Sequence, residues 1–443
     1  MIKRLPPIWI ILVGALLLRW GAFYLYYFIY KTPGGIAPSP HANEVYDFLA
    51  RELLSGRGFE TWHFAYRPPL YPMFIAAVYG MTGSLNPLAA VFAQTILSTS
   101  ISLFTYALAT ELETDRTTAW AAAALSALDP ASVAAGLVLM AETLANFFIA
   151  LALIFLARLL KAQRWRDGAA CAACVALAAL ARPNAVYFFA VVAGLIGISE
   201  TFRNVGMLTR PNWKSAVRFQ TLAQAIVFAS LALAGLMPWY LRNYAYQRVF
   251  TFATTSDFNL LFYKGVSVEM WASSQPAKTI EAEFAYELER RLGVAKAIET
   301  YDANTMWNYL VPADPRAYAV MRQMAIEVYA AHPLIYVALI PITIVKLLAF
   351  NGLSAELGFT RWIDLAFNGL LYGFALLGGW RAWQNKSWLW LTVTLSPIMY
   401  FLLVPAVTGG VQDTRARTNV TICFAILAAA GMRRAWVRRP ESR

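Results

Sequence analysis

Apolar residues along this chain form long blocks that are separated by shorter polar stretches. Eleven such blocks lie at residues 8–30, 88–110, 117–137, 143–160, 168–181, 184–198, 219–237, 334–350, 363–383, 387–405 and 419–431. Many of them approach the ~20 residues that a helix needs to cross about 30 Å of hydrocarbon. Backbone polar groups in lipid must be satisfied within a segment, so these blocks predict helices, and the alternation typical of membrane barrels is absent. We therefore predict an all-α polytopic membrane protein with about 10–12 transmembrane helices.

Two polar regions interrupt the blocks and divide the chain into three parts. These are an N-terminal transmembrane module, a polar loop region, and C-terminal transmembrane helices with a basic tail, at residues 1–237, 238–331 and 332–443. The first module carries its own polar loop at residues 31–87, between the first and second long blocks. In the longer loop, Phe284, Leu288 and Leu292 recur at helical spacing among charged residues, which predicts an amphipathic helix.

Charged residues are few and unevenly placed. They make up 14% of the chain, against roughly 25% in an average globular protein, while 59% of residues are hydrophobic and the net charge is +12. Basic residues gather between and beside the apolar blocks, and after the last block they stand at Arg433, Arg434, Arg438 and Arg439. This is the positive-inside pattern of membrane proteins, so the net charge indicates topology and we expect no nucleic-acid partner.

The two basic termini both predict a cytoplasmic location, which requires an even number of spans, whereas eleven apolar blocks are present. One solution is that block 334–350, which contains Pro341, does not cross completely. The other is that the short apolar segment 70–82 crosses, although its length and aromatic residues favour a helix in the membrane interface. With the N-terminus in the cytoplasm and segment 70–82 in the membrane interface, loop 31–69 and the stretch 238–331 are expected on the same, extracytoplasmic side.

The first loop carries candidate catalytic carboxylates. Glu44 and Asp47 open a predicted helix, and Arg67 follows with two prolines directly after it. Proline restricts the backbone, which suits a loop that aims Arg67 at an anionic group, because arginine binds phosphate through two parallel hydrogen bonds. Glu44 and Asp47 could equally be charges that stabilise a helix end.

Glu142 is the clearest ionisable residue at a predicted membrane boundary, because it opens the block 143–160. A charge in lipid costs several kcal/mol, about 2.5–3.5 on insertion scales, so such residues indicate function. We expect its carboxylate to share a cavity with the first loop. The alternative is a glutamate that only complements the dipole at a helix N-terminus.

Several arginines lie at predicted outer ends of spans, where topology does not call for positive charge. They are Arg67, Arg182, Arg242, Arg415 and Arg417, of which Arg415 and Arg417 lie outside only if the last span runs inward, as its basic tail indicates. A phosphate at the membrane surface would explain them jointly, whereas any single arginine could be extended toward lipid headgroups.

Motifs of soluble enzymes are absent, since no HExxH, Walker A, GxSxG or GxGxxG pattern occurs. His41 or His63 with Glu44 could supply metal ligands, but their spacing does not indicate a site. We therefore name no cofactor, and a divalent metal stays open without being indicated.

A series of short motifs nevertheless spans nearly the whole chain. In order they are Leu53-Leu54-Ser55-Gly56-Arg57-Gly58-Phe59, Arg67-Pro68-Pro69-Leu70-Tyr71-Pro72, Glu142-Thr143-Leu144, Leu180-Ala181-Arg182-Pro183, Pro238-Trp239-Tyr240-Leu241-Arg242-Asn243-Tyr244, His332-Pro333 and Arg415-Ala416-Arg417. In their order and their places relative to the spans they resemble the GT-C superfamily of integral-membrane glycosyltransferases. Within it, the chain is similar to the bacterial proteins of glycosyltransferase family 39, such as protein O-mannosyltransferases and lipid A aminoarabinose transferases.

The resemblance implies a GT-C helix bundle and an inverting transfer of sugar from a polyprenyl phosphate to an acceptor. A first-loop acid is the implied general base, and basic residues hold the lipid phosphate. Many relatives carry an aspartate where this chain has Ala42, so we assign the base to Glu44, with Asp47 as second choice. From the same motifs we add further substrate-binding candidates at Tyr71, Trp239 and Asn243.

The resemblance also implies a multi-pass protein of the bacterial cytoplasmic (inner) membrane whose active site faces outside the cytoplasm. Two other readings stay open. A ligase or polymerase of O-antigen type would also hold a lipid phosphate with outer arginines, and a lipid-linked-sugar transporter or flippase would also place charges in the membrane, although the repeat symmetry common in transporters is not visible. The sugar and the acceptor, whether glycolipid, polysaccharide or protein, are not readable from the chain.

Overall fold

The computed structural model describes residues 7–30, 45–60, 65, 67–199, 219–294, 316–349, 360–409 and 414–433, and within these ranges the regular elements are helices without a strand. The predicted all-α polytopic membrane fold is confirmed. Six described helices are long and apolar enough to cross a membrane, and a seventh span results if the bent pair α16–α17 is taken as one. Other apolar helices are shorter, with 13, 10 and 12 residues in α6, α10 and α21, so the expected total of ten to twelve spans stays a prediction.

The helices follow the expected blocks closely. The first half contains α1 (Pro7–Tyr24) with the π-helical turn η1 (Leu25–Ile29), α2 (Tyr46–Leu54), α4 (Leu70–Thr82), α5 (Pro87–Glu111), α6 (Arg116–Leu128), α7 (Pro130–Ala135), α8 (Glu142–Ala162), α9 (Trp165–Ala181), η2 (Pro183–Ala185) and α10 (Phe188–Gly197). The second half contains α12 (Phe219–Gln247), α13 (Thr255–Phe258), η4 (Asn259–Gly265), α14 (Val266–Ser273), α15 (Ala277–Leu292), α16 (Arg316–Ala331), α17 (Pro333–Ala349), α19 (Thr360–Gln384), α20 (Trp388–Thr408), η6 (Thr414–Val420) and α21 (Thr421–Met432).

Two helices differ from the expected blocks near a proline, in opposite ways. The block 117–137 is divided into α6 and α7 because Pro130 cannot continue the hydrogen-bonding of α6, and Asp129 instead caps α7 by accepting a hydrogen bond from the amide of Ser132 at 3.0 Å. In contrast, α12 continues through Pro238 to Gln247, ten residues beyond the expected end of the block at residue 237.

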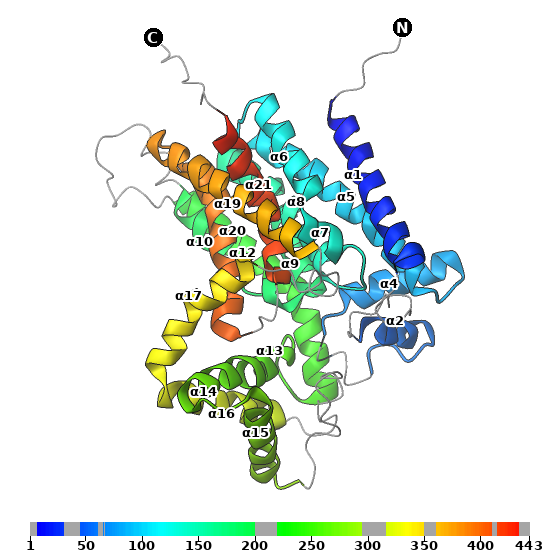
Figure 1. Cartoon of the computed structure of the whole chain (residues 1–443), viewed down its shortest axis with the longest axis vertical. Coiled ribbons are helices and arrows are strands. Elements are labelled where there is room, and N and C mark those ends of the chain that lie inside the picture. Colours follow the sequence, from blue (N-terminus) through cyan, green and yellow to red (C-terminus); the bar gives the residue numbers. More distant parts are fainter. Residues whose placement is uncertain are drawn as a thin grey trace.

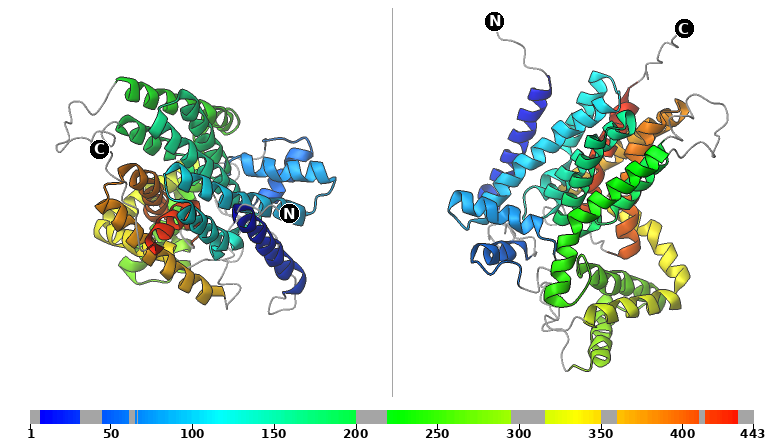
Figure 2. Two further views of the ribbon diagram at one scale, coloured as in Figure 1. Left: turned by 90° about the horizontal axis from the view of Figure 1, so that it is seen from above. Right: turned by 180° about the vertical axis from the view of Figure 1, so that it is seen from behind.

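The arrangement of the helices separates two ends of the molecule. Figure 1 and the right view of Figure 2 place the start of α1 and the end of α21 at one end and the helices α13, α14, α15 and α16 at the other. We call these four helices with η4 the polar module. The short helices α2 and α4 lie at the same end as this module. Which side of the membrane each end faces stays a prediction.

The polar module has its own apolar core, as the spacing of α15 predicted. Leu288 and Leu292 of α15 are buried against Phe258 and Phe262 and against Met321 of α16. The predicted amphipathic helix is thus confirmed as α15. Its charged face carries ion pairs, such as those of Glu287 with two arginines of the same helix.

Glycines allow α19 and α21 to approach closely. A Cβ atom on Gly378 would lie 1.9 Å from the carbonyl oxygen of Leu427, and one on Gly431 would lie 1.9 Å from that of Phe374. Small residues let membrane helices pack backbone against backbone in this way. This contact holds α21, and therefore the η6 segment that precedes it, against the bundle.

Candidate active site

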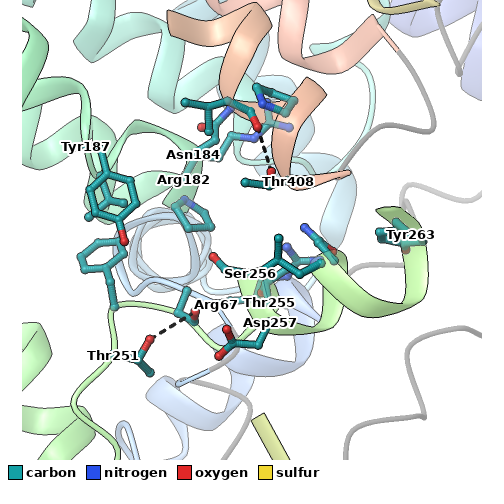
Figure 3. Close-up of a pocket in the computed structure, with 18 of the residues that line it drawn as sticks. Arg67, Arg182, Asn184, Tyr187, Thr251, Thr255, Ser256, Asp257, Tyr263 and Thr408 are labelled. Carbon is teal, nitrogen blue, oxygen red and sulfur yellow. Dashed lines mark hydrogen bonds between the residues drawn. The ribbon is translucent and has the colours of Figure 1, made fainter. Parts of the chain in front are cut away.

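A cavity of about 560 Å³ opens where the membrane helices meet the polar module. Figure 3 shows this cavity with part of its lining. In the first half of the chain, the lining residues come from the first loop and from the starts of α8 and η2. In the second half, they come from α12 and the segment after it, from α13, η4 and α16, and from α20 and η6. Segments that are far apart in the sequence therefore build one site.

Glu142 and two of the predicted arginines form the first charged face of this cavity. Glu142 is the first residue of α8, where the helix dipole favours its negative charge, and its side chain is only 5% exposed. Its Oε1 lies 3.0 Å from Nη2 of Arg182 and 4.0 Å from Nε of Arg415. Arg182 follows α9 directly, and Arg415 belongs to η6, so three separate segments bring these charges together.

Arg67 from the first loop lines the same cavity. Its guanidinium lies 5.4 Å from the ring centre of Tyr46, the first residue of α2, which also lines the cavity. The cation–π contact and the two prolines that follow Arg67 restrict the position of its side chain. Three of the five arginines predicted for a phosphate therefore line one cavity, and the carboxylate of Glu142 lies next to two of them.

A second charged face was missed by the sequence reading. Asp257 of α13 accepts two hydrogen bonds from Arg322 of α16, from Nε at 2.8 Å and from Nη2 at 2.9 Å, and both residues line the cavity. The hydrogen bonds that Arg322 donates to Asp257 raise the pKa of Arg322 above its usual value. The signal for Asp257 was its place in the polar run Thr254–Asp257, shortly after the motif at the end of α12, whereas nothing local marks Arg322 as its partner.

Trp239 and Asn243 do not line the cavity, but they form hydrogen bonds to Thr251 and Phe252, which do line it. Trp239 Nε1 donates a hydrogen bond of 3.0 Å to the carbonyl of Phe252, and Asn243 Nδ2 donates to the carbonyls of Thr251 and Phe252 at 2.9 and 3.2 Å. Arg242 donates to Asn243 Oδ1 at 2.9 Å and lies against the ring of Trp239. The motif that contains these residues supports the lining from behind, and direct substrate contact by them stays a prediction.

Other predicted residues also lie outside the lining. Tyr71 is buried and donates to Gln94 Oε1 at 2.6 Å, and Arg417 is buried against Asp129. Asp47 is paired with Arg51 at 2.9 Å and accepts a hydrogen bond from Tyr79. Their roles toward a substrate remain predictions.

The preferred base, Glu44, lies outside the described residues, as do His41 and His63. Among the residues that the structure does describe, no group of three His, Cys, Asp or Glu side chains is placed to hold a metal ion.

Comparisons with known proteins agree with this architecture. Residues 66–211 match the family described as dolichyl-phosphate-mannose-protein mannosyltransferase, and this stretch contains Arg67, Glu142 and Arg182. No curated protein is matched by the sequence.

Among solved structures, the oligosaccharyltransferase of Archaeoglobus fulgidus in its apo form is 12% identical, with a TM-score of 0.54 over 96% of this chain and 50% of that chain. The same enzyme, AglB, in complex with an inhibitory peptide and a dolichol-phosphate is 13% identical, with a TM-score of 0.52 over the same shares of both chains. ArnT from Cupriavidus metallidurans bound to undecaprenyl phosphate is 14% identical over 95% of this chain and 77% of that chain, but its TM-score of 0.36 is too low to support an argument. The chain spans about half the length of the oligosaccharyltransferase, and at these identities the similarity shows the fold alone.

Proposed function

We propose that this chain is an inverting GT-C-type glycosyltransferase that uses a polyprenyl-phosphate-linked sugar, and its family match over residues 66–211 and its fold support this proposal. The observation that carries the proposal is the gathering of Arg67, Arg182 and Arg415 around one cavity with Glu142. The lining as a whole carries Arg67, Arg182, Arg322 and Arg415 against Glu142 and Asp257, and this excess of positive charge suits a lipid phosphate. Guanidinium groups bind phosphate oxygens bidentately and stabilise the charge that a departing phosphate acquires.

In the proposed reaction, the acceptor hydroxyl loses its proton to a carboxylate while its oxygen attacks the anomeric carbon. The bond from that carbon to the phosphate oxygen breaks, and the phosphate leaves with the electron pair, which inverts the anomeric configuration. We assign the base to Glu44, with Asp47 as the alternative, and the phosphate to the three arginines. Glu142 orients Arg182 and Arg415 through its ion pairs.

We further propose that the cavity faces outside the cytoplasm of a bacterial inner membrane. Arg433, directly after α21, and the polar module lie at opposite ends of the molecule, which supports this orientation under the positive-inside rule. A lipid phosphate as leaving group requires no nucleotide-binding site, which is consistent with a reaction outside the cytoplasm.

The test is release of polyprenyl phosphate from a sugar-linked donor by the purified protein in lipid nanodiscs. Arg182→Ala should weaken binding of polyprenyl phosphate more than Arg182→Lys, because lysine keeps the charge but not the planar fork. Arg290→Gln, which changes an exposed arginine of α15 outside the cavity, is the matched control and should bind normally.

Glu44→Gln should stop sugar transfer with donor binding retained, and retained transfer in Glu44→Gln together with loss in Asp47→Asn would move the base to Asp47. Movement of the lipid-linked sugar across the membrane without release of polyprenyl phosphate would contradict the proposal and favour a flippase.

A further inference from the structure

The cavity has two charged faces of different composition. The first, formed by Arg182, Arg415 and Glu142, consists of charged side chains. The second, from α13 and the start of η4, combines a carboxylate with hydroxyl and amide groups, at Asp257, Thr255, Ser256 and Asn259. Figure 3 shows Thr255, Ser256 and Asp257 grouped beside Arg67, with Arg182 and Asn184 on the other side of the cavity.

The carboxylate of Asp257 keeps capacity for a ligand although Arg322 binds it. Its side chain is 5% exposed, and each of its two oxygens accepts one hydrogen bond from Arg322. An ionised carboxylate can accept about four hydrogen bonds in total, so each oxygen retains a position for a further donor. The two hydrogen bonds from Arg322 also fix the plane of the carboxylate, which prepares it to accept hydrogen bonds from hydroxyl groups.

This second face is held in a fixed place relative to Arg67. The amide and the hydroxyl of Thr254 both donate to the carbonyl of Ala65, at 2.9 and 3.3 Å. Ala65 lies two residues before Arg67, and the amide of Asp257 donates to the carbonyl of Thr254 at 3.2 Å. Backbone hydrogen bonds thus connect the loop that carries Arg67 to the turn that carries Asp257.

Docking of α16 does not by itself explain the ion pair between Asp257 and Arg322. Tyr318, Met321 and Met324 of α16 are already buried against the apolar core of the polar module. A second bidentate pair, Arg291 with Glu327 at 3.0 and 2.7 Å, joins α15 to α16 outside the cavity. The pair in the cavity is therefore available for a different role.

We infer that Asp257, oriented by Arg322 and flanked by Thr255, Ser256 and Asn259, binds hydroxyl groups of the donor sugar. The inference rests on the proposed function and adds the residues that recognise the sugar. A sugar linked to the phosphate by one bond must lie in the same cavity as the arginines, and a carboxylate beside hydroxyl and amide groups offers the acceptors and donors that a polyhydroxylated ring requires. Arg322 acts here as a positioning residue, because it holds the carboxylate.

The experiment compares two ligands on the full-length protein in nanodiscs. One is bare polyprenyl phosphate. The other is polyprenyl phosphate that carries mannose, glucose or aminoarabinose, whichever of the three binds the wild type most tightly. Asp257→Asn should weaken binding of the sugar-linked lipid on the order of tenfold, the effect of losing a charge-assisted hydrogen bond, and leave bare polyprenyl phosphate unaffected. Arg322→Gln should weaken the same ligand less, and Glu327→Gln is the matched control that should change neither affinity.

Each other outcome counts against the inference. Equal weakening of both ligands by Asp257→Asn would reduce the residue to a structural or phosphate-binding role. Unchanged donor binding with a raised KM for the acceptor would assign it to the acceptor instead. If Asp257→Asn does not fold, as judged by its thermal unfolding, Arg322→Gln supplies the same comparison. A wild type that binds the bare lipid but gains nothing from any sugar contradicts this inference alone, whereas a wild type that does not bind the bare lipid contradicts the proposed function as well.

Discussion

Asp129 and Arg417 are 288 positions apart in the sequence, and their side chains form an ion pair of 2.8 Å from which solvent is completely excluded. The carboxylate of Asp129 also accepts a hydrogen bond of 3.0 Å from the hydroxyl of Thr421. The pair therefore anchors η6 and the start of α21 against α7. Arg415, two residues before Arg417 in the same short helix, is directed to the cavity and to Glu142.

Loss of this anchor should destabilise the protein strongly. Asp129→Asn should reduce the free energy of unfolding by about 3–5 kcal/mol, because Arg417 would remain buried without a compensating charge. Unfolding of the purified protein by denaturant in detergent measures the change. The matched control is Glu111→Gln, which removes the half-exposed pair of Glu111 with Arg158 and should cost at most about 1 kcal/mol. Similar losses in the two variants would show that the Asp129 pair does not anchor η6.

Glu142→Gln should separate phosphate binding from sugar transfer. The carboxylate holds Arg182 and Arg415 in place, so its loss should lower kcat by roughly tenfold to a hundredfold through misplaced arginines. It also removes a negative charge beside the proposed phosphate site, so affinity for polyprenyl phosphate should stay the same or rise. Glu283→Gln on the exposed face of α15 controls for a general charge effect. Normal transfer by Glu142→Gln would reduce this residue to a charge at the start of α8.

The stability of the protein should increase with pH through the titration of Lys264. Burial lowers the pKa of Lys264 to about 8, from the 10.5 that is ordinary for a lysine, and its Nζ donates to the carbonyl of Ala406 at 2.9 Å. Between these two pKa values the unfolded chain binds more protons than the folded one, so the free energy of unfolding rises as pH rises from about 8 to 10.5. Lys264→Met should flatten this rise when unfolding is measured across that pH range. Lys278→Met at an exposed position should keep the wild-type slope, and an unchanged slope in Lys264→Met would remove Lys264 as its source.

The contact between α19 and α21 should not tolerate an added methyl group. In Gly378→Ala the new Cβ would meet the carbonyl oxygen of Leu427, which is backbone and cannot rotate away. We expect a loss of about 1–3 kcal/mol or more in the free energy of unfolding. Gly373→Ala on the same helix is the matched control, since no atom lies within 4 Å of its Cβ position, and it should be neutral or slightly stabilising. Equal effects of the two changes would argue against a close approach of the helices.

Local pattern was sufficient to predict much of the helical architecture. The helix α4 has the bounds of the apolar segment 70–82, and the first-loop helix α2 ends just before a turn at Gly56, whose φ of +81° suits glycine. These features depend on neighbouring residues only. The break at Pro130 was not predicted, because whether a proline interrupts or only bends a helix depends on its surroundings, as the uninterrupted Pro238 in α12 shows.

The sequence by itself determined that the chain forms membrane helices, because apolar blocks in lipid must satisfy their backbone groups internally. It also marked the arginines and Glu142 as functional candidates. Only the tertiary structure decided which of them meet. Arg415 faces the cavity and Arg417 the protein interior because of a partner at Asp129 that no local pattern identifies. Likewise Asp257 and Arg322, 65 positions apart, become neighbours only when the polar module folds. The physical reason is that contacts between distant segments depend on how helices pack against each other, which the spacing of residues within one helix does not specify.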